Sequence, residues 1–205
     1  MEPFADLAVG LTLSLLRKIP EADSFVRAGN WPKGDFPLAR KVSGRHFGIV
    51  GLGNIGREIA KRMAAFGPVS YCGTSPKDVP YSYYANAEAL AAAVDVLIVA
   101  CPATEATRGI VGQNVLDALG AGGWLVNIAR GSVVDESALI DALEQGSIAG
   151  AALDVFADEP NVRDALLRSP RTLLTPHIAS ATVEVRHRMA EIVLANLDGF
   201  HARSE

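Results

Sequence analysis

The chain has 205 residues, of which 49% are hydrophobic and 20% are charged, and its formal net charge is −4. This composition is that of an ordinary globular protein with one good-sized core or two small ones, and the negative charge argues against a nucleic-acid-binding surface. The two cysteines, Cys72 and Cys101, form neither a metal-binding spacing nor a disulfide framework. We therefore expect no metal site, two small buried thiols, and a protein of the reducing cytoplasm.

The N-terminal part of the chain, residues 1–45, is predicted to form a helix and an arm. Leucines at positions 7, 11 and 15 and Ile19 recur every four residues, which predicts one long helix over residues 4–28 that ends at Gly29. The apolar run within it is too short to span a bilayer, so we expect no membrane segment.

The arm at residues 29–45 carries two large apolar side chains, Trp31 and Phe36. Two interpretations of these side chains stay open. They pack on the surface of their own domain, or they contact a second copy of the chain in a homodimer.

Strands and helices alternate from residue 46 onward. Near-continuous apolar strands separated by helices predict an α/β fold, with a Rossmann-type, doubly wound parallel sheet in a three-layer arrangement. We assign one dinucleotide-binding domain to residues 1–205, with the Rossmann core at 46–180 and a C-terminal helix within 181–205. The predicted strands are 46–50, 68–72, 94–101, 124–128, 149–155 and 172–175, and the predicted helices are 54–66, 87–93, 113–119, 135–144 and 183–201.

A glycine fingerprint, Gly51-Leu52-Gly53-Asn54-Ile55-Gly56, lies between the first strand and the first helix of this core. Gly51 permits a tight turn, Gly53 lets the backbone approach a pyrophosphate, and Gly56 allows close packing of helix on strand. The helix N-terminus adds free N–H groups and a positive dipole end. This context predicts a dinucleotide site, and the alternative is a tight turn without a ligand.

The second strand indicates which dinucleotide binds. An NAD site places an acid at the end of this strand, but here no acid occurs before Asp78, which lies beyond Pro76. Thr74 and Ser75 can donate hydrogen bonds to a 2′-phosphate and Lys77 can add charge. We expect a preference for NADP with NAD as the other possibility, and Lys77 can equally be an ordinary exposed lysine.

Three later strands end near residues that can do chemistry, namely Arg130, Asp154 with Glu159, and His177. Ligands of open α/β sheets bind outside the carboxyl ends of the strands. An arginine, a carboxylate and a histidine placed there suit an anionic carbonyl substrate and a proton transfer. Taken singly, each has a plainer interpretation as a surface arginine, a solvated acid or a turn histidine.

Five stretches, GLGNIG, VACPATEATRGIV, LVNIARGSVVDESAL, GAALDVFADEP and TPHIASAT, together resemble the cofactor-binding domain of the D-isomer-specific 2-hydroxyacid dehydrogenases. The resemblance covers nearly the whole chain. Through YCGTSPK and VACPATEATR it is similar to the glyoxylate, hydroxypyruvate and hydroxyphenylpyruvate reductases. That subgroup tends to use NADP, which agrees with the missing acid.

The resemblance implies a role for each residue. Arg130 would hold the substrate's carboxylate and carbonyl, Glu159 would pair with the catalytic histidine, and His177 would be the general acid. Asp154 would lie near the nicotinamide end of the cofactor. Beyond the fingerprint glycines and the loop residues Thr74, Ser75 and Lys77, the implied cofactor contacts are Asn54, Ile55, Cys101, Pro102, Thr107, Ile128, Ala129, Arg130, His177 and Ser180.

The implied reaction is hydride transfer from a reduced nicotinamide to a small 2-oxo acid such as glyoxylate or hydroxypyruvate, giving the D-2-hydroxy acid. Full-length members of the family begin with a substrate domain of on the order of 100 residues, which we find no match for here. We therefore expect this chain to bind cofactor and to turn over poorly or not at all. The alternatives are a non-catalytic dinucleotide-binding module and a dimerisation module, the latter formed by the N-terminal helix and the Trp31 arm.

Overall fold

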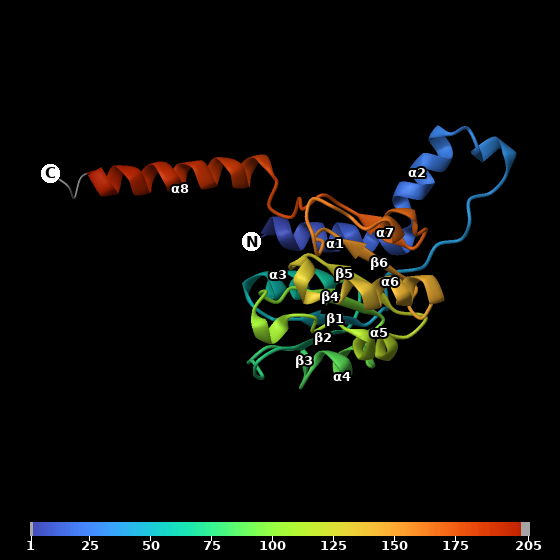
Figure 1. Cartoon of the computed structure of the whole chain (residues 1–205), viewed down its shortest axis with the longest axis horizontal. Helices are drawn as coiled ribbons and strands as arrows, with labels where there is room; N and C mark the ends of the chain where they lie inside the picture. The colour runs from blue at the N-terminus through green and yellow to red at the C-terminus, as the bar shows by residue number, and fades with distance from the viewer. Residues whose placement is uncertain (1, 202–205) are drawn as a thin grey trace.

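The computed structural model describes residues 2–201, with side chains through residue 196. Within these residues, parallel strands form one seven-stranded sheet in the order β3-β2-β1-β4-β5-β6-β7, and Figure 1 shows this order from the lower edge upward. This is the doubly wound order of a Rossmann fold, so the predicted fold class is confirmed. The strands are β1 Phe47–Val50, β2 Val69–Cys72, β3 Ser82–Tyr84, β4 Val96–Val99, β5 Trp124–Asn127, β6 Gly150–Leu153 and β7 Thr172–Leu174.

Helices cover both faces of the sheet. The helices α1 and α3 pack on one face, and α4, α5 and α6 pack on the other. The α8 helix extends away from the sheet (Figure 1), and most of its described side chains are exposed. The helices are α1 Glu2–Arg17, α2 Ile19–Arg27, α3 Asn54–Met63, α4 Ala87–Ala91, α5 Gln113–Leu119, α6 Glu136–Gln145, α7 Asp164–Arg168 and α8 Val183–His201.

Successive strand residues enter two separate cores, because side chains alternate across a strand. On β1, Phe47 and Ile49 face α1 and α3, whereas Val50 faces the layer of α4, α5 and α6. Both sets are buried, which is why the strands read as continuous apolar runs. The sheet is thus the middle of three layers, as predicted.

The predicted single helix over residues 4–28 is wrong, because the chain breaks it at Lys18, whose φ is 52°. Pro20 has no N–H to donate to the carbonyl of Leu16 four residues earlier, and it lies in the first turn of the new helix α2, which begins at Ile19. The carbonyl of Leu16 instead accepts a hydrogen bond from Arg40 N at 2.9 Å. Ile19 is consequently 50% exposed and does not belong to the buried stripe.

Two short elements, β3 and α7, were not predicted. They have three and five residues, respectively, which is too few for a periodic pattern to stand out. In the arm, Phe36 packs edge-on against Phe25 of α2 with ring centroids 5.4 Å apart, whereas Trp31 is 67% exposed. No helix among residues 2–201 is long and apolar enough to cross a membrane.

Candidate active site

The glycine fingerprint forms the turn from β1 into α3. Gly51 has φ 95°, its N–H donates to Cys72 O at 2.9 Å, and a Cβ there would lie 2.6 Å from Cys101 Cα. A Cβ at Gly56 would collide with the carbonyl oxygen of Gly51. No heavy atom lies within 4 Å of a Cβ built on Gly53, so space beside this residue is open. Packing therefore requires the first and third glycines, and the second faces room for a ligand.

The N-terminus of α3 faces this open space. The hydrogen bonds of the helix begin at Arg57, whose N–H donates to Gly53 O at 2.9 Å. The N–H groups of residues 54–56 precede this first turn, so no helix carbonyl lies in place to accept from them, and the helix dipole makes this end positive. A pyrophosphate is the kind of anion that such a helix end binds.

A cleft of about 990 Å³ lies at the carboxyl ends of β1, β2 and β4, where the strand order reverses. This volume is at the upper end of the usual range for ligand pockets. Its walls include seven of the predicted cofactor-binding residues, Gly51, Gly53, Thr74, Lys77, Cys101, Pro102 and Thr107. They also include residues that the sequence did not single out, among them Asn86, Glu88, Gln113 and Asn114.

The two cysteines lie in the wall of this cleft on either side of Gly51. Burial, together with the neighbouring Cys101, raises the pKa of the Cys72 thiol to about 11, and burial also raises the pKa of Cys101. Both are free and buried. They are therefore protonated, inert wall residues, as predicted for small buried thiols.

A histidine–carboxylate pair lies near the ends of β6 and β7. His177 Nδ1 and Glu159 Oε2 are 2.6 Å apart, and Phe156 N donates to the other carboxylate oxygen at 2.9 Å. Partial burial would by itself raise the pKa of Glu159. The hydrogen bonds from His177 and Phe156 and the charges of His177 and Arg130 outweigh it, so the pKa lies below its usual range.

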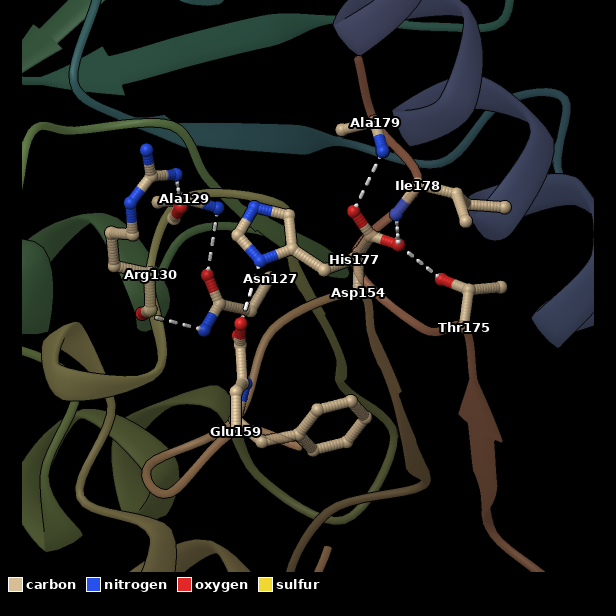
Figure 2. A network of polar contacts seen from close by, with 10 residues as sticks. Asn127, Ala129, Arg130, Asp154, Glu159, Thr175, His177, Ile178 and Ala179 are labelled. Carbon is tan, nitrogen blue, oxygen red and sulfur yellow. Dashed lines mark hydrogen bonds and ion pairs between the residues drawn. The ribbon is translucent and has the colours of Figure 1, made fainter. Parts of the chain in front are cut away.

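Arg130 follows β5 and lies in the same region as this pair; in Figure 2, His177 and Glu159 meet, and the side chain of Arg130 beside them turns back toward Ala129. Its Nη1 donates to Ala129 O at 2.6 Å. Asn127, fully buried at the end of β5, shapes the turn from beneath. The amide of Asn127 donates to Arg130 O at 3.1 Å, and its oxygen accepts from Ala129 N at 3.0 Å.

The turn after Arg130 packs directly on the turn that carries Glu159. A Cβ at Gly131 would collide with the carbonyl group of Phe156, so only glycine permits this approach. The carboxylate of Glu136, at the start of α6, accepts from Ala157 N at 3.0 Å. These contacts hold the turn after Arg130 against the turn that carries Glu159.

Asp154 holds the loop that carries His177 (Figure 2). Its carboxylate, which has no exposed surface, accepts from Thr175 Oγ1 at 2.6 Å, Ile178 N at 2.8 Å and Ala179 N at 3.0 Å. The backbone carbonyl of Asp154 also accepts from His177 N at 2.9 Å, and His177 has the uncommon φ of 51°. Such conformations persist where the surroundings over-determine them, often at functional sites.

The structure separates the predicted site residues into three groups. Seven line the large cleft, whereas Glu159 and His177 border a second cavity of about 250 Å³. The others, which do not form walls of either cavity, are Asn54, Ile55, Gly56, Ser75, Ile128, Ala129, Arg130, Asp154 and Ser180. The cofactor contacts of all these residues stay predictions. In the described part of the chain, no group of three or more His, Cys, Asp or Glu side chains could hold a metal ion.

Sequence reasoning missed the residues that position the site, above all Asn127, Gly131 and Glu136. Asn127 had a signal, since it is a polar residue at the end of an otherwise apolar strand. Glu136 and Gly131 had none, because their contacts join segments that only the fold brings together.

Comparisons with known proteins show the family of the chain. The chain is 51% identical over 199 residues to a glyoxylate/hydroxypyruvate reductase of Arabidopsis thaliana, covering 96% of this chain and 64% of that protein. It is 48% identical over 196 residues to the hydroxyphenylpyruvate reductase of Plectranthus scutellarioides, covering 95% and 63% of the two chains.

A solved structure is similar over nearly the whole chain. It is that of an NADPH-dependent glyoxylate/hydroxypyruvate reductase from Sinorhizobium meliloti in complex with NADP and malonate. It has a TM-score of 0.94 and 45% identity, and the match covers 98% of this chain and 64% of that one. The chain thus spans just under two thirds of the length of these relatives. Residues 9–179 match the NAD binding domain of the D-isomer specific 2-hydroxyacid dehydrogenases, and the chain belongs to this family.

Proposed function

We propose that this chain supplies the nucleotide-binding domain and the proton-transfer groups of an NAD(P)-dependent reductase. The substrate is a small 2-oxo acid such as glyoxylate or hydroxypyruvate, and the product is the D-2-hydroxy acid. The observation that carries the proposal is the 2.6 Å contact between His177 and Glu159 beside the guanidinium of Arg130. The names of the Arabidopsis and Plectranthus relatives support this substrate class.

The residues present fit a dinucleotide. Open space beside Gly53, the amides at the start of α3 and a cleft of about 990 Å³ together suit a pyrophosphate flanked by two nucleosides. When bound, a reduced nicotinamide supplies the hydride that the keto carbon receives. The chain's own side chains supply binding, charge and a proton.

Arg130 and His177 divide the remaining chemistry. The planar guanidinium of Arg130 can bind the substrate carboxylate in a bidentate manner and stabilise negative charge on the carbonyl oxygen. Because the ionised carboxylate of Glu159 only accepts hydrogen bonds, Nδ1 of His177 carries a proton and Nε2 is the nitrogen that serves the substrate. Nε2 donates its proton to the developing alkoxide, which completes the hydroxyl group.

A turnover assay tests this function. We expect slow consumption of NADPH with glyoxylate or hydroxypyruvate that is abolished in His177→Ala, while the affinity for NADPH is nearly unchanged. His187→Ala, which removes an exposed histidine of α8, is the matched control. Turnover that His177→Ala leaves unchanged, or an equal loss of turnover and of NADPH affinity in this variant, would count against the role assigned to His177.

We also propose that NADP is preferred over NAD. The loop directly after β2, residues 73–77, carries no carboxylate, while Thr74 and Lys77 lie in the wall of the cleft and Ser75 is exposed beside them. A carboxylate at this place would repel a 2′-phosphate, and a lysine attracts it. Titration with NADPH and NADH measures the preference directly, and tighter binding of NADH would overturn it.

We propose that the arm contacts a second copy of the chain in a homodimer. Four large apolar side chains on α2 and the arm are exposed, Ile19 at 50%, Val26 at 52%, Trp31 at 67% and Leu38 at 95%. The helix α2 stands out from the sheet (Figure 1), and Val26 and Trp31 border one small cavity there. Exposed apolar surface of this kind is typical of an interface between chains. Sedimentation should give a dimer that Trp31→Ser weakens, and a monomer at high concentration would refute the proposed dimer.

Free cysteines are typical of proteins in a reducing compartment, so we place the protein in the cytoplasm.

A further inference from the structure

The loop that follows β2, residues 73–77, is held at both ends by tyrosine hydroxyl groups. At its start, Tyr83 Oη donates a hydrogen bond to Gly73 O at 3.3 Å. At its end, Lys77 N donates to Tyr71 Oη at 2.6 Å. We call these two side chains the tyrosine clamp.

The clamp is itself rigid. Tyr71 on β2 and Tyr83 on β3 are register partners in the parallel sheet, and their ring centroids lie 5.5 Å apart. Tyr71 has no exposed surface and belongs to the core beneath α3. Its ring cannot move without disturbing that core, because protein interiors are close-packed.

The loop forms part of the wall of the nucleotide cleft. Thr74 and Lys77 line this cleft, and no acid stands between them. The hydrogen bond to Tyr71 is donated by the backbone N–H of Lys77, so it fixes the backbone position from which the lysine side chain extends. A loop without this anchor would have to be ordered when the ligand binds, and that ordering costs affinity.

We infer that Tyr71 and Tyr83 are positioning residues for recognition of a phosphate on the adenosine ribose. They hold the loop so that Thr74 and Lys77 meet a 2′-phosphate, although neither tyrosine touches it. This inference rests on the proposed preference for NADP. It goes further in assigning part of that preference to side chains outside the cleft wall.

The test uses the 205-residue chain and two probes, adenosine 2′,5′-bisphosphate and adenosine 5′-monophosphate, measured by calorimetry. Tyr71→Phe keeps the packed ring and removes only the hydroxyl group. One hydrogen bond of ordinary strength corresponds to an affinity change of about 3- to 10-fold, and we expect this loss for the bisphosphate alone. Tyr83→Phe, whose hydrogen bond is longer, should show a smaller loss of the same kind. Tyr84→Phe is the matched control, since Tyr84 lies on the opposite face of β3.

A second arm distinguishes positioning from general weakening. In Lys77→Ala the 2′-phosphate loses its cation, so adding Tyr71→Phe should weaken bisphosphate binding little further, and the two effects should be non-additive. Equal loss of both probes in Tyr71→Phe, no loss, or full additivity with Lys77→Ala would overturn the inference. The proposed NADP preference is judged separately, from NADPH against NADH in the native chain.

Discussion

Replacing Asp154 by alanine removes the acceptor that three hydrogen-bond donors share. The backbone N–H of Ala179 is the most affected, because this residue is only 2% exposed and water cannot replace the carboxylate there. Thr175 and Ile178 are partly exposed, so water can satisfy their donors at a lower cost.

The expected loss of stability follows from these exposures. A buried donor left without a partner costs about 1–3 kcal/mol, and a hydrogen bond that water replaces about 0.5–1.5 kcal/mol. Together the three donors of Asp154 amount to about 2–6 kcal/mol. Removing a buried charge also removes its desolvation cost, which places the expected value in the lower half of this range.

Urea unfolding of Asp154→Ala at neutral pH, followed by circular dichroism, measures this loss. The matched control is Asp164→Ala, which removes an exposed carboxylate whose partner Arg168 is also exposed, so its effect should be small. Thr175→Val removes one donor and should lie between the two. A loss for Asp154→Ala below about 1 kcal/mol, or equal to that of Asp164→Ala, would refute the role assigned to this carboxylate.

Three further predictions concern the histidine–carboxylate pair. Glu159→Gln should lower His177-dependent turnover by about 100-fold or more with little change in NADPH affinity, and unchanged turnover would contradict the pairing role. The pKa of Glu159 lies below its usual range. The stability that this residue contributes is therefore complete above the ordinary glutamate pKa, and it is lost as the pH falls through the lower folded value. Carboxyl NMR should show this low titration, and a titration in the usual range would count against it. Gly131→Ala should cost about 1–3 kcal/mol in urea unfolding, because its Cβ would meet the Phe156 carbonyl. A shift of Phe156 would also weaken the hydrogen bond from its N–H to Glu159, which should raise the pKa of Glu159. A variant as stable as the native chain, with the same Glu159 titration, would show that the two turns are not in tight contact.

Much of the fold could be predicted because its signals are local. Continuous apolar strands exist since both faces of the sheet are covered, and the fingerprint marks where β1 turns into α3. The N-terminal helix was wrongly predicted to be continuous because its apolar spacing outweighed Pro20, whose missing N–H is a local signal for the break.

The sequence by itself determined which residue types end the strands, and so it identified Arg130, Glu159 and His177 as candidates. The carboxyl ends of parallel strands share one edge, which makes such a prediction possible without coordinates. Only the tertiary structure decided how these groups meet: the 2.6 Å contact of His177 with Glu159, and the burial of Asp154 beneath the histidine loop. These contacts join segments 18 or more residues apart. Their geometry depends on strand register and on the packing of one turn against another, which no local pattern encodes.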